Sequence, residues 1–351
     1  MSFKNCRIAG RDTSPEKYHA PQTVERGDPR FVISPSSLRA GGECWRRWKD
    51  GYTAPDTGPK RWGSMLDCLA LTPKEFWRRY ALQPAKYETK GMECPNCKSV
   101  TESKKCSACK CDRVEVTVEK EWTNQSHTCQ KWVAEHAERG IEVVTQAECD
   151  EVMAAVKRLD ADPILKSLLD CSDRQVWVVG EWHDKPTGLK IPVQCLIDLA
   201  PWKESEFSGS LADLKSTRNA APDKWQRWSS ERGYHVQAAF DLDLWNAAEG
   251  EERGQWLFAV QENYPPFQTA RRMLSEDKLA LGRQIYQRLL GEYAKAVKSG
   301  IWPDYDTNIH PALRGWQIDN LNPWDERQEL VKIPTLVVPP DPYEAMELSA
   351  H

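Results

Sequence analysis

The chain has 351 residues, 40% of them hydrophobic, which is enough for one large domain or two ordinary ones with a proper core. Its formal charge of −4 gives no global case for nucleic-acid binding, so such a function has to rest on local charge. No apolar run approaches the roughly 18 residues of a membrane span, and the first residues lack the apolar core of a signal peptide. We therefore expect a cytoplasmic protein with no membrane partner.

Residues 1–30 are polar and dotted with proline and glycine, which predicts a flexible N-terminal arm. Ser34, followed directly by proline, is a helix start signal and marks the beginning of the main folded region, placed at 31–310. Within 61–80 the apolar residues recur at helical spacing, so this segment is expected to be a helix with Asp67 on its polar side.

Residues 88–130 lack the helical spacing of the preceding segment, and their sequence predicts a small inserted β module. The chain has 12 cysteines, and without a secretion signal their spacing indicates metal binding or small buried hydrophobes. Four of them form two Cys-x2-Cys pairs, which fit a tetrahedral structural Zn²⁺ site. These are Cys94, Cys97, Cys106 and Cys109. Cys111 is an alternative last ligand, and an iron–sulfur cluster is the alternative metal group.

Two roles for this zinc module stay open. It is either a stapled insertion that props the rim of a cleft or a basic surface for DNA phosphates. The basic residues are Lys98, Lys104, Lys105, Lys110 and Arg113.

Downstream, residues 174–202 contain two β runs joined by a turn, and 211–217 form the next strand. A helix over 233–249, a further strand and a long amphipathic helix ended by Gly300 follow. The remainder, 311–351, is Pro-rich and is expected to be an irregular tail. This order predicts an α/β (α+β) fold with a mixed central sheet flanked by helices.

Charged residues gather on the predicted core strands. Asp213 and Lys215 are two apart and face the same side of a strand, and Asp198 ends an apolar strand, where an unpaired carboxylate is costly. With Asp67 they provide the oxygen ligands that Mg²⁺ or Mn²⁺ prefers, beside a lysine that can position or deprotonate water. The alternative interpretation of Asp213 and Lys215 is an ordinary ion pair.

The order of four motifs resembles the PD-(D/E)xK nuclease superfamily, most closely its RecE-like, exonuclease VIII branch. The motifs are GSMLD (63–67), CLID (195–198), DLK (213–215) and YHVQAAFD (234–241). Three further stretches support it: ISPSSLRAGGECWRRW (33–48), LALTPKEF (69–76) and GIWPDY (300–305). The resemblance covers roughly 31–310, interrupted by the zinc module, and implies a restriction-endonuclease-like fold.

The resemblance implies that Asp198 and Asp213 are metal ligands, that Lys215 is the catalytic lysine, and that Gln237 orients the substrate or the nucleophile. The expected place of Lys215 is beside the attacking water, with Asp213 turned to the metal.

At two positions the chain departs from the branch, which usually has His in place of Asp67 and Tyr in place of Asp241. A carboxylate can still bind a metal, so Asp67 is kept as a third ligand. The role of Asp241 stays open.

DNA contacts are expected on both sides of these motifs. Ser216, Thr217 and Arg218 directly follow the lysine and are placed to hold a phosphate. Lys60 and Arg61 precede a tryptophan, an interleaving of charge and aromatics that is typical of single-strand grooves and also of a packed helix face.

The resemblance implies a metal-dependent exonuclease that digests double-stranded DNA ends in the 5′→3′ direction and leaves 3′ single-stranded tails for a strand-annealing partner in recombination. It also implies a homo-oligomer and a phage or prophage origin in a bacterial host. Two alternatives stay open: another deoxyribonuclease of the same fold, such as an endonuclease or nickase, and a non-catalytic DNA-binding protein.

Overall fold

The computed structural model describes residues 3–53 and 58–305, so the tail predicted at 311–351 lies outside the described residues. The helices are α1 (Pro15–Tyr18), α2 (Pro35–Glu43), α3 (Trp45–Lys49), α4 (Gly58–Leu71), the 3₁₀ turn η1 (Pro73–Glu75), α5 (Phe76–Arg79), α6 (His127–Glu138), α7 (Gln146–Asp160), α8 (Pro163–Asp170), α9 (Pro222–Glu231), α10 (Tyr234–Glu249) and α11 (Glu276–Ser299). The strands are β1 (Phe3–Gly10), β2 (Tyr80–Leu82), β3 (Lys86–Glu93), β4 (Val100–Thr101), β5 (Val114–Glu121), β6 (Glu142–Val144), β7 (Ser172–His183), β8 (Lys190–Pro201), β9 (Ser210–Thr217), β10 (Gln255–Glu262) and β11 (Thr269–Met273).

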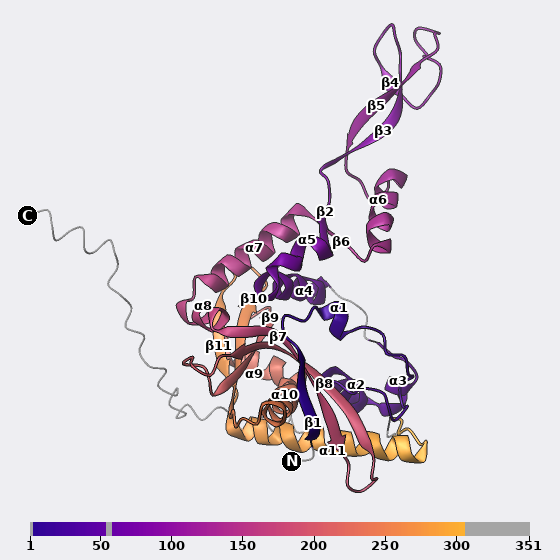
Figure 1. Cartoon of the computed structure of the whole chain (residues 1–351). Coiled ribbons are helices and arrows are strands. Elements are labelled where there is room, and N and C mark those ends of the chain that lie inside the picture. The colour runs from indigo at the N-terminus through magenta and orange to yellow at the C-terminus, as the bar shows by residue number, and fades with distance from the viewer. Residues whose placement is uncertain (1–2, 54–57, 306–351) are drawn as a thin grey trace, which may run out of the picture. The chain divides into compact units, whose positions relative to one another are not determined.

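A mixed sheet with the order β1-β7-β8-β9-β10-β11 forms the centre of the fold (Figure 1). Neighbouring strands are antiparallel except β9 and β10, which run parallel and pair along their whole length. Because the chain passes through α9 and α10 between these two strands, this crossover is the βαβ part of the fold. The predicted α/β class with a mixed central sheet is confirmed.

Helices cover both faces of this sheet. One apolar cluster joins it to α2, α3, α10 and α11, and a second joins it to α4, α7 and α8 (Figure 1). Strand β9 contributes Leu211 to the first cluster and Ala212 and Leu214 to the second, so it is buried on both faces. None of the described helices combines the length and the apolarity needed to cross a membrane.

Local signals explain where several helices begin. Ser34 caps α2, and its Oγ accepts the backbone N–H of Ser37 at 3.3 Å, with Pro35 in the first turn as predicted. Thr145 and Glu148 form a capping box at the start of α7. The long helix α11 ends at Gly300, whose φ of 71° is the left-handed conformation that glycine adopts at little cost.

The described part of residues 1–30 does not form the flexible arm that was expected. Strand β1 pairs with the edge of β7, and Phe3 is 5% exposed. The Phe3 ring meets Trp182 at 5.2 Å and Phe240 at 5.6 Å, both edge-on. The polar composition of this segment hides its strand because β7, far along the chain, supplies the pairing and the apolar contacts.

We expect Phe3→Ala to lower the free energy of unfolding by about 3 to 5 kcal/mol, the range for emptying a buried phenylalanine site. Urea denaturation followed by Trp fluorescence measures it. The exposed neighbour Lys4→Ala serves as the control and should change stability by less than about 0.5 kcal/mol. Equal stability of the two variants would mean that β1 does not contribute to the folded core.

Candidate active site and metal centre

The central sheet opens between β8 and β9. These strands share one register pair, Leu199 with Ala212, whereas β9 and β10 remain paired throughout. Asp198 and Asp213 are the next residues along the two strands, on the same side of that pair, so both carboxylates lie where the two strands separate. The apolar strands thus carry their charged residues where the pairing of β8 with β9 ends.

The Asp198 carboxylate is held by two donors. Its Oδ1 accepts the Gln175 side-chain amide at 2.9 Å, and its Oδ2 accepts the backbone N–H of Leu214 at 3.0 Å. The second bond replaces a backbone carbonyl of the ladder at the point where β8 and β9 part. Each carboxylate oxygen has two lone pairs, so one on each oxygen is left for a cation.

Lys215 pairs directly with Asp213. Its Nζ lies 2.6 Å from Asp213 Oδ2, and their side chains are 18% and 4% exposed. The ammonium also lies 5.2 Å from the centre of the Tyr234 ring. Burial lowers the pKa of Lys215, but the Asp213 and Asp198 carboxylates raise it above its ordinary value, so the lysine is charged.

This ion pair corrects the expectation that Lys215 stands apart from Asp213. Lys215 is the nearest cation to a carboxylate that is almost entirely buried, and a buried charge requires a partner. The alternative interpretation, an ion pair, describes the geometry of these two side chains.

Two further carboxyl groups border Asp213, one from α4 and one from α10. Asp67 is half-buried and its Oδ1 has no hydrogen-bond partner in the described part of the chain; burial and Asp213 raise its pKa to about 7, while Lys215 opposes this. Asp241 is 1% exposed and its Oδ1 also lacks a hydrogen bond; burial and Asp213 raise its pKa well above the ordinary value, and the Gln237 amide lowers it.

The donor set fits a hard divalent cation. Burial raises the pKa values of Asp67, Asp198 and Asp241, the Asp213 carboxylate raises them further, and the Lys215 ammonium lowers all three. The unpaired oxygens and the surplus of negative charge favour a cation with oxygen ligands. In the described ranges, the cysteine group is the one cluster whose ligand atoms all lie within 4.8 Å of one another. The acidic cluster does not reach this spacing, so its fit to a cation rests on its charge and its unpaired oxygens.

Sequence patterns do not identify two residues of this site. Gln175 follows Ser172, Asp173 and Arg174 at the polar start of β7, and Tyr234 begins a helix that is buried on most sides. One more polar residue in this stretch gives no signal for Gln175. Tyr234 acquires its place only through the contact of α10 with β9.

The residues after the lysine lie in three different environments. Ser216 is half-buried and faces α4, where a Cβ added to Gly63 would lie 3.0 Å from the Ser216 hydroxyl oxygen. The Thr217 hydroxyl is engaged by Asn219, accepting its backbone N–H and donating to its carbonyl, both at 3.3 Å. Arg218 is exposed. Ser216 and Arg218 are thus accessible, and Thr217 stabilises the turn.

The two basic residues of α4 that were predicted to contact DNA lie in different environments. Lys60 is exposed in the first turn. Arg61 lies 2.5 Å from Glu142 and 3.1 Å from Glu148, and it donates to the carbonyl of Val143 at 2.6 Å. These acceptors neutralise the guanidinium, so Arg61 anchors α4 to β6 and α7, and its contact with DNA stays a prediction.

The zinc module is built on the three-stranded sheet β4-β3-β5. The four thiols of Cys94, Cys97, Cys106 and Cys109 lie within 4.8 Å of one another and can hold a metal ion. Each Cys-x2-Cys pair repeats one geometry, in which the N–H of the second cysteine points to the first sulfur, at 3.5 Å from Cys97 and 3.4 Å from Cys109. Cys111 borders the cluster, with its sulfur 3.4 Å from that of Cys94. Four thiolates in two such knuckles fit tetrahedral zinc.

Arg113 does not belong to the exposed basic surface considered for this module. It is 8% exposed, and its guanidinium donates to the Met92 and Ser99 carbonyls and to the Ser99 hydroxyl. Lys104, Lys105 and Lys110 are exposed, so the basic surface is smaller than the sequence indicates.

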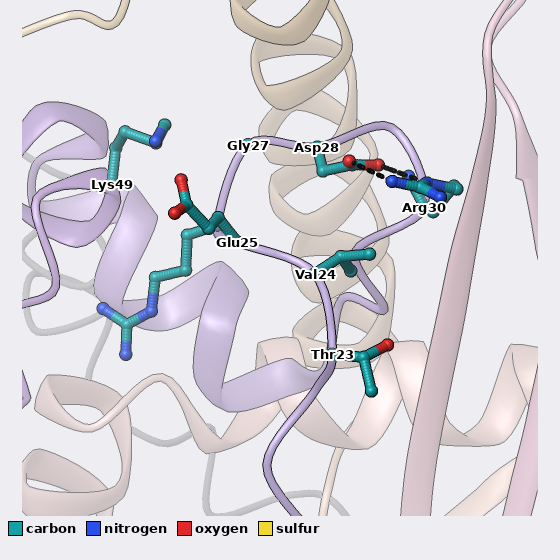
Figure 2. Close-up of a pocket in the computed structure, with 8 residues that line it drawn as sticks. Thr23, Val24, Glu25, Gly27, Asp28, Arg30 and Lys49 are labelled. Carbon is teal, nitrogen blue, oxygen red and sulfur yellow. Dashed lines mark hydrogen bonds and ion pairs between the residues drawn. The ribbon is translucent and has the colours of Figure 1, made fainter.

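A separate surface hollow of about 430 Å³ lies along the loop from Thr23 to Arg30 (Figure 2). Asp28 and Arg30 face each other in it and form an ion pair at 2.8 Å. None of its lining residues belongs to the acidic cluster, so we assign it no part in the chemistry.

A family model described as "PDDEXK-like domain of unknown function (DUF3799)" matches residues 114–310, more than half of the chain. The chain belongs to this PDDEXK-like family. The matched region includes Asp198, Asp213 and Lys215, whereas Asp67 lies before it. The PD-(D/E)xK resemblance is therefore confirmed at the level of this domain.

One solved structure shares the fold of this chain. A crystal structure from Eubacterium rectale, described as a "putative exonuclease", covers 84% of this chain and 90% of its own, with 13% identity and a TM-score of 0.50. SSO0001 covers 40% of this chain and 60% of its own (12% identity, TM-score 0.24), and Scheffersomyces stipitis Rai1, in complex with (3'-NADP)+ and calcium, covers 82% and 74% (9%, 0.26). The first likeness supports the fold, and the other two carry no argument. No curated protein sequence matches the chain.

We expect the stability of the PDDEXK-like domain to fall as pH rises from about 4 to 7 through Asp67. The folded protein keeps the Asp67 proton up to a pKa of about 7, whereas an unfolded aspartate releases it near about 3.9. The folded state thus binds more protons across this window, and each step in pH lowers the free energy of unfolding.

Urea denaturation of zinc-loaded protein at pH 5, 6 and 7 measures this dependence. Asp67→Asn should make the pH slope shallower, and the exposed Asp160→Asn should not. An identical slope in Asp67→Asn and the wild type would exclude Asp67 as its source.

For the zinc module, we expect about one zinc ion per chain by elemental analysis, lost in Cys106→Ser. Cys111→Ser is the matched control and should retain the metal, because its sulfur lies outside the set of four. Loss of zinc in Cys111→Ser instead would show that the ligand set includes this fifth thiol.

Proposed function

We propose that the PDDEXK-like domain is a metal-dependent deoxyribonuclease that hydrolyses phosphodiester bonds. The observation that carries this proposal is the placement of Asp198, Asp213 and Lys215 at the opening between β8 and β9, with Asp67 and Asp241 beside them. A nuclease site needs carboxylates for a cation and a charged group for the phosphate or the water, and these residues provide both.

Asp198 and Asp213 would hold Mg²⁺ or Mn²⁺, with Asp67 as a third ligand. When bound, such an ion supplies Lewis acidity and neutralises charge on the leaving oxygen. The Lys215 ammonium, held between Asp213 and the Tyr234 ring, orients the attacking water or a phosphate oxygen by donating a hydrogen bond. The Gln237 amide, which hydrogen-bonds Asp241, would orient the substrate from α10.

Accessible polar and basic residues after the catalytic lysine and on α4 would hold the DNA backbone. Ser216 and Arg218 follow the lysine directly, and Lys60 lies on α4, the helix that also carries Asp67. Because contacts to phosphate position a duplex without reading its sequence, these residues suit a nuclease with little sequence preference.

The finer activity that we propose is exonucleolytic digestion of double-stranded DNA ends, 5′→3′, leaving 3′ single-stranded tails. Two things support it: the RecE-like order of motifs, and the description of the Eubacterium rectale structure as a putative exonuclease. On the same resemblance we propose a homo-oligomer that hands its product to a single-strand annealing protein in recombination.

With Mg²⁺ or Mn²⁺, the protein should shorten end-labelled linear duplex DNA and leave closed circular DNA intact. Lys215→Ala and Asp213→Ala should each lower the rate by at least about 100-fold, because removing one electrostatic group from an active site typically costs that much. Lys190→Ala, an exposed lysine at the turn end of β8, is the control and should keep the wild-type rate.

The products separate the alternatives. Cutting of the closed circle would identify an endonuclease or nickase instead of an exonuclease. Absence of hydrolysis with either metal would leave a non-catalytic DNA-binding protein, in which the ion pair of Lys215 with Asp213 is permanent.

A further inference from the structure

Gln175 has an unusual backbone for its position. It lies in β7, is 4% exposed, and has a φ of 46° although it is not glycine. Its neighbours pair regularly with β8, Arg174 with Leu199 and Val176 with Ile197. Gln175, between them, adopts a backbone conformation that residues other than glycine rarely adopt. Such conformations persist only where surrounding residues enforce them.

Surrounding segments hold this part of β7 from two sides. The backbone N–H of Thr13 donates to the Gln175 carbonyl at 3.0 Å, and that of Asp12 donates to the Arg174 carbonyl at 2.9 Å. The Arg174 guanidinium in turn donates to the carbonyls of Ala70 and Leu169, at 3.1 and 3.0 Å. The segment after β1 and the ends of α4 and α8 therefore fix the backbone on both sides of the unusual φ.

The Gln175 side chain contacts the Asp198 carboxylate. Gln175 Nε2 donates to Asp198 Oδ1 at 2.9 Å, while the backbone N–H of Leu214 takes Oδ2 at 3.0 Å. One donor comes from each strand that flanks β8. With a donor on each oxygen, the Asp198 carboxylate cannot rotate without losing a hydrogen bond.

We propose that Gln175 is a positioning residue, whose amide holds the Asp198 carboxylate in the orientation in which it binds the divalent cation. This inference rests on the proposed function, because it takes Asp198 as a metal ligand. A partner of this kind orients a ligand and typically changes metal affinity by about 10- to 100-fold when it is removed.

Two substitutions separate this role from a purely structural one. Gln175→Met keeps the volume of the side chain and removes its donor. Gln175→Gly also removes the hydrogen-bond donor, but glycine adopts the positive φ at little cost, so this variant relieves the backbone at position 175. Gln194→Met is the matched control, because Gln194 is half-buried on β8 and bonds Trp177 at 3.1 Å, away from Asp198.

The measurement is Mn²⁺ binding to zinc-loaded protein, followed through the electron paramagnetic resonance signal of free Mn²⁺. Asp213→Asn identifies the binding that belongs to the acidic cluster. We expect both Gln175 variants to bind Mn²⁺ about 10- to 100-fold more weakly than the wild type and Gln194→Met to bind normally.

Wild-type Mn²⁺ affinity in both Gln175 variants would overturn the inference, as would wild-type binding that Asp213→Asn does not change. A wild type that binds Mn²⁺ at the cluster but cuts no DNA would end the proposed function, whereas the loss of affinity in the Gln175 variants would still support the positioning role. The two failures are therefore distinguishable.

Discussion

The hydrogen bond from the Leu214 backbone N–H to the Asp198 carboxylate is the contact on which the site depends. It ends the β8–β9 ladder with a side chain in place of a main-chain carbonyl, so the two strands separate without leaving that N–H unpaired in a buried position. The separation frees the edge of β9 beside Asp213 and Lys215 from main-chain pairing with β8.

This arrangement gathers more negative than positive charge in the site, which costs stability. Asp67, Asp198 and Asp241 all have raised pKa values, since burial and the nearby Asp213 disfavour their charged forms. Lys215 compensates only part of the charge that four carboxylates would carry. A fold selected for stability alone would not gather these groups, whereas one selected for binding a cation and a phosphate has reason to keep the imbalance.

Sequence patterns predict the features whose causes are local. The start of α2 at Ser34 and the paired cysteine knuckles depend on neighbours within a few residues, and the placing of Asp213 and Lys215 on one side of β9 follows from strand geometry. Features that depend on distant partners are not predictable in this way. Strand β1 needs the edge of β7, the role of Arg61 follows from Glu142 and Glu148, and Gln175 becomes significant only opposite Asp198.

The pairing of β2 with β6 has a consequence for how this chain can vary. Tyr80 lies opposite Glu142 and Leu82 opposite Val144, so two segments about 60 residues apart along the chain are joined side by side. The cysteine knuckles lie between them and precede the region that matches the family model, which begins at residue 114 with β5 and continues through α6. Because β2 and β6 are paired, the knuckles can vary in length without rearranging the central sheet.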